Sequence, residues 1–230
     1  MHDILSNATF FGVMVSILSY ELGLFIKKKT QSPICNPLLI SIIVTIGVLL
    51  LLHIDYKSYN AGAQYLSYLL TPATVCLAIP LYEQLSLLVR NVKAILIGII
   101  AGVLASIGSV FGLCLLFGLG HEYYVTLLPK SITTAIGMGV SEELGGIVTI
   151  SVSVIIITGV IGNIIAETVC KLFRITDPVA KGIAIGSASH AIGTARALEM
   201  GEVEGAMSSL AIAVAGLITV VASSIFANLI

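Results

Sequence analysis

Residues 186–199 read Gly186-Ser-Ala-Ser-His-Ala-Ile-Gly-Thr-Ala-Arg-Ala-Leu-Glu199, within a chain that otherwise consists mostly of long apolar segments. A histidine, an arginine and a carboxylate are costly to place at the depth of a bilayer. Glycine-rich and polar backbone is tolerated there only where protein or a water-filled cavity surrounds it. The stretch therefore indicates a binding site inside a membrane protein.

The composition limits the class of protein. Of the 230 residues, 57% are hydrophobic and 10% are charged, the mean hydropathy is +1.09, and soluble domains carry about 25% charged residues. We therefore expect an all-α integral membrane protein. The net charge of −1 argues against nucleic acid as a partner. The four cysteines lack the paired spacing of a metal site or a disulfide framework, and no ATP-binding or hydrolase motif is present. We expect no metal, no cofactor and no enzymatic activity.

Apolar length predicts the membrane passes. A transmembrane helix needs about 20 apolar residues. Runs of that kind cover residues 4–26, 37–54, 60–85, 94–118, 146–172 and 205–229, and polar or glycine residues interrupt 129–145 and 178–200. Eight of the eleven Lys and Arg residues fall on one side of the membrane if 129–145 is re-entrant and 178–200 crosses. The positive-inside rule makes that side cytoplasmic, which predicts about seven transmembrane helices plus a re-entrant segment.

The same passes suggest an internal repeat. We expect one membrane domain over residues 1–230, with a peripheral first helix, two repeats of opposite sense and broken middle helices, and the re-entrant segment between the repeats. The expected boundaries are 1–30, 37–118, 129–145 and 146–230. Interrupted segments at matching positions of two inverted halves are typical of the binding site of a transporter.

The first candidate site segment is the break around Thr71-Pro72. Thr71 suits a helix N-cap and Pro72 suits the first helical position. A helix that begins inside the membrane directs free N–H groups at a cavity, which favours a carboxylate ligand. The candidates are Thr71, Ala73 and Thr74. The alternative is a proline kink held by neighbouring helices.

The second and third candidate segments supply cations and hydroxyl groups. Near the proline of the re-entrant segment the candidates are Lys130, Ser131, Thr133 and Thr134, and in the opening stretch they are Ser189, His190, Thr194 and Arg196. Proton coupling through His190, Glu142 or Glu143 is a further possibility. One alternative is an ordinary charged outer loop around Lys130. Another is that Arg196 and Glu199, spaced i, i+3, simply neutralise each other, and His190 can also be a satisfied core histidine.

Glycine ridges mark the run at 94–118. Gly98 and Gly102, and likewise Gly108 and Gly112, are spaced four residues apart. Small residues at this spacing allow helices to approach closely. We interpret them as helix packing or as the interface of a homo-oligomer.

These segments resemble the signature stretches of the LrgB/CidB family of antiholin-like membrane proteins. The resemblance lies in Thr71-Pro-Ala-Thr-Val-Cys-Leu-Ala-Ile-Pro-Leu-Tyr82, Pro129-Lys-Ser-Ile-Thr-Thr134 and Ser189-His-Ala-Ile-Gly-Thr-Ala-Arg196, together with Asn36-Pro37. It covers nearly the whole chain. Two positions depart from it, since the family often has Gly at the position of Thr71 and Pro at the position of Ala135. Both departures affect helix starts and so concern substrate preference.

The resemblance implies several functional expectations. It implies a multi-pass protein of the bacterial cytoplasmic (inner) membrane that works beside a smaller LrgA/CidA-type partner. Bacterial members are described as modulators of murein hydrolase export and lysis, plastid relatives carry glycolate and glycerate, and some bacterial relatives are linked to pyruvate. We expect a carrier of small monocarboxylate anions that works by alternating access. Membrane lipid is expected to surround it. The alternatives are a holin- or antiholin-like regulator and a receptor or scaffold.

Overall fold

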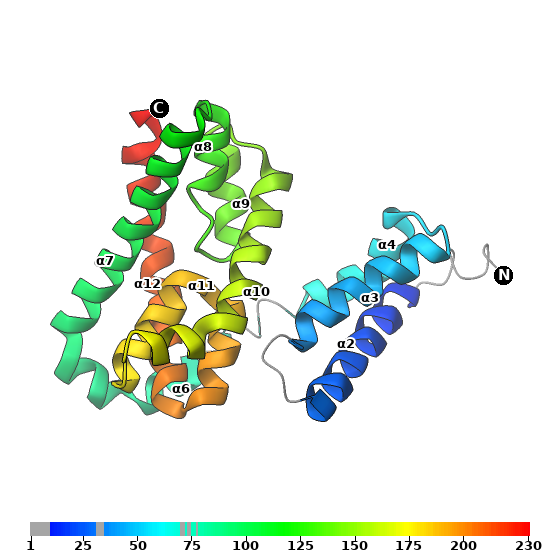
Figure 1. Cartoon of the computed structure of the whole chain (residues 1–230), viewed down its shortest axis with the longest axis horizontal. Helices are drawn as coiled ribbons and strands as arrows, with labels where there is room; N and C mark the ends of the chain where they lie inside the picture. The colour runs from blue at the N-terminus through cyan, green and yellow to red at the C-terminus, as the bar shows by residue number, and fades with distance from the viewer. Residues whose placement is uncertain (1–9, 31–34, 70–71, 73–74, 77) are drawn as a thin grey trace. The chain divides into compact units, whose positions relative to one another are not determined.

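The computed structural model describes residues 10–30, 35–69, 72, 75–76 and 78–230. The described residues are almost all helical and include no strand. The chain divides into two compact units, Met1–Cys76 and Leu77–Ile230 (Figure 1). The expected repeat boundaries at residues 37 and 118 stay a prediction. Each unit is described by itself.

The first unit contains three helices. They are α2 (Phe11–Thr30), α3 (Pro37–Leu51) and α4 (Tyr56–Ser67). The side chain of Asn36 caps α3 by accepting hydrogen bonds from two backbone N–H groups, and Asp55 caps α4 in the same way with one. Such caps satisfy N–H groups that a helix start leaves without partners. Helix α2 contacts both α3 and α4, and Ser16 of α2 hydrogen-bonds Tyr59 of α4 through their hydroxyl groups at 2.7 Å.

The second unit contains the longest apolar helices. Its elements are α6 (Ala78–Glu83), α7 (Leu85–Phe117), α8 (His121–Leu127), α9 (Thr134–Glu143), α10 (Val148–Leu172), α11 (Pro178–Met200) and α12 (Glu202–Phe226), which a 3₁₀ turn (Ala227–Leu229) follows. Among the described residues, α7, α10 and α12 with its final turn are long and apolar enough to cross a membrane. The protein is therefore an all-helical membrane protein.

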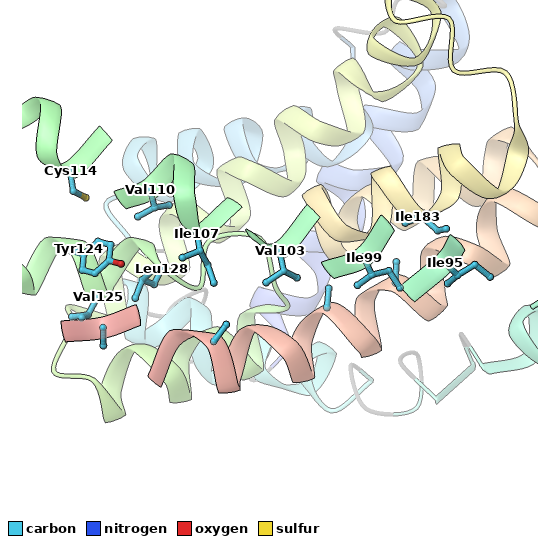
Figure 2. Packing of buried hydrophobic residues seen from close by; sticks show 14 of the residues in the cluster. Ile95, Ile99, Val103, Ile107, Val110, Cys114, Tyr124, Val125, Leu128 and Ile183 are labelled. Atoms are coloured by element: carbon cyan, nitrogen blue, oxygen red, sulfur yellow. The ribbon is translucent and has the colours of Figure 1, made fainter. Parts of the chain in front are cut away.

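One face of α7 forms the spine of the core. Ile95, Ile99, Val103, Ile107 and Val110 are each at most 3% exposed and recur every three or four residues, the period of a single helix face. Figure 2 shows their side chains in a row along α7. The cluster also contains buried residues of α8 and α12. Ile183 of α11 also belongs to this cluster, and the neighbouring small-residue face of α7, with Gly98 and Gly102, packs against α11.

Helix α11 begins and ends at the same end of the second unit. Near its beginning, Lys181 forms an ion pair of 3.8 Å with Glu204 at the start of α12. Near its end, Arg196 forms an ion pair with Glu167 in the last turns of α10. We call this end the basic end, because it also carries Arg90, Lys93, Lys171 and Arg174.

The turn of α11 lies at His190. This residue has φ 42° and ψ −144°, which is not a helical conformation. Its ring Nε2 lies 3.0 Å from the carbonyl oxygen of Ile155. Ile155 precedes Glu167 on α10 by twelve residues, or about 18 Å of helix. The two arms of α11 therefore form a hairpin, which we call the basic-end hairpin, and its tip reaches about two thirds of the way along α10 from the basic end.

Helices α8 and α9 form a second hairpin at the opposite end. The Tyr124 hydroxyl of α8 donates to the carbonyl oxygen of Phe226 at the end of α12. The backbone N–H of Ile147, which precedes α10, donates to Thr126 Oγ1 at 2.8 Å. The turn between α8 and α9 reaches inward, because Ser131 Oγ lies 2.9 Å from Ser106 Oγ, about 16 Å along α7 from its end. We call residues 121–143 the far-end hairpin.

The two hairpin tips meet at one residue of α10. His190 contacts the backbone of Ile155, while Gly137 of the far-end hairpin is packed against the Ile155 side chain, whose Cδ1 leaves no room for a Cβ there. In Figure 1, α11 lies toward one end of the second unit and α8 and α9 toward the other, whereas α7 and α12 run the whole length. The described part of the second unit thus consists of three long helices and two opposed hairpins, together with α6 and the final 3₁₀ turn.

This architecture corrects part of the topology expected from the sequence. The prediction that residues 178–200 cross is wrong, because both ends of α11 lie at the basic end. Residues 60–85 form no single described helix, since α4 ends at Ser67 and α6 begins at Ala78. The count of seven membrane-spanning helices and the inverted repeat of 37–118 with 146–230 are therefore not confirmed.

Candidate functional site

A cavity of about 910 Å³ lies between α7, the first arm of α11 and the tip of the far-end hairpin. It extends along α7 from Leu87 at the basic end to Ser109, or about 33 Å of helix. Lys130 and Ser131 contribute from the far-end tip. All of its lining residues belong to the second unit. We call it the α7–α11 cavity.

Small residues make the room for this cavity. Ala94, Gly98 and Gly102 line it from α7, and Ala180 and Ala184 line it from α11. Both sets are spaced four residues apart, which places each set on one face of its helix. A Cβ at Gly102 would lie 3.1 Å from Ser187 Cβ, so the two helices touch there and separate beside the contact.

The Gly98–Gly102 ridge predicted from the sequence is thus a packing ridge against α11. An added Cβ at Gly98 would contact the Ile183 side chain at 3.4 Å. Among the described residues, Gly108 and Gly112 have no atom within 4 Å of such a Cβ. The prediction that this second pair packs another helix is therefore not confirmed within the chain.

The deep end of the cavity carries a cluster of donors. Lys130 Nζ donates to Ser131 Oγ at 3.1 Å, and Ser131 Oγ lies 2.9 Å from Ser106 Oγ. Ser109 Oγ, one turn further on, donates to the Ser106 carbonyl oxygen at 2.7 Å. The ion pairs within the described part of the chain leave Lys130 without a carboxylate partner. A half-buried ammonium group beside hydroxyl groups is suited to hold an anion.

The start of α9 adds to this positive character. Thr133 is the N-cap residue of α9 and makes no side-chain cap hydrogen bond, and Thr134 is the first helical residue. A helix N-terminus presents backbone N–H groups and a partial positive charge. The N-cap of α9 follows Ser131 by two residues. Thr133 and Thr134 therefore lie next to the donor cluster, although neither borders the cavity.

Residues of the opening stretch mainly hold the break in α11. Thr194 Oγ1 donates to the His190 carbonyl oxygen at 3.0 Å and lies 2.6 Å from Ser208 Oγ of α12. Asn163 of α10 donates to the Ile192 carbonyl oxygen at 2.6 Å. These bonds satisfy backbone groups that a broken helix leaves open. The side chains of Ser189, His190 and Thr194 are buried and do not line the α7–α11 cavity.

Glycines of α10 let this break approach closely. A Cβ at Gly159 would lie 2.7 Å from His190 Cε1, and one at Gly162 would overlap the Ser189 side chain. Both positions require the absence of a side chain. His190 therefore has the role of a satisfied core histidine in this structure, which is one of the alternatives that the sequence left open.

Arg196 is neutralised by two carboxylates. Its guanidinium donates to Glu199 at 2.6 Å and to Glu167, which also binds Lys171 at 2.8 Å. These residues border a second cavity of about 620 Å³ at the basic end. Arg196 and Glu199 thus form an ion pair, which is one of the alternatives that the sequence left open. Arg196 lies away from the donor cluster.

The sequence of the whole chain has clear relatives among known proteins. The LrgB-like family model matches residues 16–229. The chain belongs to the LrgB-like family. It is 37% identical over 218 residues to proteins named "Antiholin-like protein LrgB" from Bacillus cereus (strain B4264) and Bacillus anthracis (strain A0248), covering 94% of this chain and 95% of each relative. No solved structure matches. The resemblance predicted from the sequence is confirmed.

Within this LrgB-like chain, the remaining predicted site residues fall outside the cavity or outside the described residues. Thr71, Ala73 and Thr74 are among the residues that the structure does not describe. Glu142 and Glu143 are exposed at the C-terminal end of α9 and do not line the α7–α11 cavity. Proton coupling through them stays a prediction.

Sequence reasoning missed three serines of the cavity. Ser106 and Ser109 lie on α7 beside the glycine ridge, and Ser187 lies on α11 opposite Gly102. The available signal was the position of Ser106, which continues the Gly98–Gly102 ridge by one turn and places a hydroxyl on the same helix face.

Proposed function

We propose that the α7–α11 cavity binds a small monocarboxylate and that this LrgB-like protein carries it across the membrane by alternating access. The observation that carries the proposal is the cluster of Lys130, Ser131 and Ser106 at the deep end of the cavity. An ammonium group with no carboxylate partner among the described residues, two hydroxyl groups and the start of α9 meet there. They supply charge and donors that a carboxylate accepts.

The size of the cavity supports a small and partly hydrated ligand. Ligand pockets commonly enclose about 300–1,000 Å³, and the volume of about 910 Å³ is far larger than an acid of two or three carbons. Water remaining in the cavity lowers the cost of an unpaired ammonium group at that depth. A larger organic anion would have to meet the apolar walls around Ile183 and Val179.

The opposed hairpins supply a route to alternating access. The cavity reaches residues at the basic end, with Arg90 and Asp177 exposed there. The far-end hairpin stands between the donor cluster and the other end. Transporters with broken helices alternate access by moving one part against the other around a fixed site. In this proposal the contacts at Ile155 separate and re-form as access changes.

The orientation of this carrier follows from its charges. The positive-inside rule places the basic end in the cytoplasm, with the far-end hairpin and the C-terminus outside. The protein is then a multi-pass protein of the bacterial cytoplasmic membrane, with its donor cluster reached from the cytoplasm in the present conformation.

An antiholin-like function is the second candidate. The names of the relatives favour it. In that function the protein, with a smaller LrgA/CidA-type partner, would regulate murein hydrolase export and lysis. A pore regulator needs surfaces for oligomer contacts. It does not need a cluster of an ammonium group and hydroxyl groups at the end of a cavity. Transport that alters the level of a metabolic acid would also connect the two functions.

The test is uptake by proteoliposomes that contain the purified full-length chain alone. Labelled pyruvate, glycolate and lactate are added outside, and empty liposomes give the background. We expect saturable uptake of at least one acid, and competition among the three. Absence of uptake of every acid, with and without the partner protein, combined with altered lysis in cells, would favour the antiholin-like function.

A further inference from the structure

Ser187 is a buried hydroxyl on the wall of the α7–α11 cavity that has no hydrogen-bond partner. The residue is 5% exposed, and its Oγ makes no hydrogen bond within the described structure. Buried hydroxyl groups are nearly always bonded, and helical serines commonly bond the carbonyl oxygen four residues back. Ser209 in α12 does so, whereas Ser187 does not. An unused donor and acceptor beside a cavity points to a ligand.

Ser187 lies about one helical turn from the donor cluster. Its Cβ faces Gly102, where an added Cβ would lie 3.1 Å away, and Ser106 follows Gly102 on the same face of α7. Residues spaced i, i+4 are about 6 Å apart. That spacing joins position 102 to Ser106, and Ser187 contacts position 102 from α11. A small ligand with two oxygens about 3 Å apart can therefore reach both serine hydroxyl groups and bond each at about 2.8 Å.

Oxygens this close occur on a carboxylate and on the carbon next to it. We propose that Ser187 binds an oxygen substituent on carbon 2 of the carried acid, while the Lys130 cluster binds the carboxylate, so that Ser187 selects 2-hydroxy and 2-oxo acids over plain fatty acids. This inference rests on the proposed function. A serine hydroxyl can donate to an oxo group and can donate to or accept from a hydroxyl group. Its position changes by rotation about one torsion.

Glycine at position 102 is part of this arrangement. Any side chain there would contact Ser187 at 3.1–3.5 Å and hold its hydroxyl against α7. Glycine at this contact therefore leaves no side chain to hold the Ser187 hydroxyl, which can turn toward a ligand.

Lactate and propionate form the matched pair of probes, because they differ only in the hydroxyl on carbon 2. Uptake of both is measured in proteoliposomes with the wild type, Ser187→Ala and Ser223→Ala. Ser223 of α12 is the matched control, since its Oγ is also buried without a partner and it borders none of the described cavities. Both substitutions remove an unpartnered hydroxyl group, so neither is expected to unfold the protein.

We expect the wild type and Ser223→Ala to prefer lactate. Ser187→Ala should lower the kcat/KM for lactate roughly fivefold, the effect of one hydrogen bond, and leave propionate unchanged. An unaltered lactate-to-propionate ratio in Ser187→Ala would overturn the inference, as would equal losses for both acids.

A binding measurement separates this inference from the proposed function. The thermal unfolding temperature of the purified chain is measured with saturating lactate or propionate. If the wild type carries neither acid, transport fails, but larger stabilisation by lactate in the wild type than in Ser187→Ala still supports the Ser187 subsite. Equal stabilisation of the two proteins by lactate counts against it.

Discussion

Lys130→Met should lower the uptake of a small monocarboxylate roughly 30- to 100-fold, the factor expected when a charged hydrogen-bonding partner is lost. Lys130 is the cation at the deep end of the α7–α11 cavity and already donates to Ser131. Methionine keeps the length and the apolar stem of the side chain but has neither the charge nor the N–H groups. The measurement is initial uptake of labelled pyruvate into proteoliposomes at several concentrations.

Lys93→Met is the control for this substitution. Lys93 lies on α7 near the basic end, is exposed and does not line the cavity. It receives the same change of charge and shape and should retain wild-type uptake. If Lys130→Met transports as well as Lys93→Met, then the donor cluster does not bind the acid.

Gly186→Leu should cost about 3 kcal/mol or more in stability, because overpacking of a tight helix contact has no room to relax. A Cβ at Gly186 would overlap the Ser208 carbonyl oxygen and lie 2.8 Å from Ala211 Cβ. Since α11 contacts α12 along this line, the basic-end hairpin would separate from α12. The measurement is thermal unfolding of the purified protein in detergent.

Gly108→Leu makes the same change where there is space. Among the described residues, no atom lies within 4 Å of a Cβ at Gly108. It should therefore keep its unfolding temperature, while Gly186→Leu loses many degrees or fails to yield a single species. Equal unfolding temperatures for the two variants would show that α11 and α12 are not packed as the structure has them.

Apolar length predicted the long helices well. The runs at 94–118, 146–172 and 205–229 correspond to α7, α10 and α12, with ends that differ by several residues at most, except that α7 begins at Leu85. These helices satisfy their own backbone hydrogen bonds and bury a wide apolar surface, so local sequence determines them. Lys130 and Ser131 were predicted as site residues for a related reason, because a charge in an apolar segment is conspicuous.

The prediction from sequence failed at α11, because its two short arms together have the length of one membrane-spanning helix. The arms of α11, 178–189 and 191–200, each span about 15–18 Å, half of the hydrocarbon thickness. Joined in sequence, they have the length of a full pass. The turn falls at His190, whose positive φ is uncommon for a residue other than glycine, so no turn signal marks it. Contacts that hold the turn, such as those with the Ile155 carbonyl and the Glu167 carboxylate, come from another helix.

The same limit applies to individual site residues. Arg196 was predicted to bind substrate because its charge lies in an apolar chain. One of its carboxylate partners, Glu199, was visible at i, i+3, but the other, Glu167, is 29 positions away. Ser106 was overlooked because a serine within an apolar helix usually bonds its own backbone. Only the tertiary contact with Ser131 makes Ser106 part of a cluster.

Cysteine labelling tests most directly whether a hydrated cavity between α7 and α11 binds a small carboxylate. In a variant without the four native cysteines, Ala188→Cys places a thiol on the cavity wall, while Leu104→Cys places one on an exposed apolar face of α7 that does not line the cavity. A charged thiol reagent should modify Cys at 188 and not at 104, and saturating pyruvate or lactate should slow the reaction. An unreactive thiol at 188, or a rate that no small acid changes, would contradict the account.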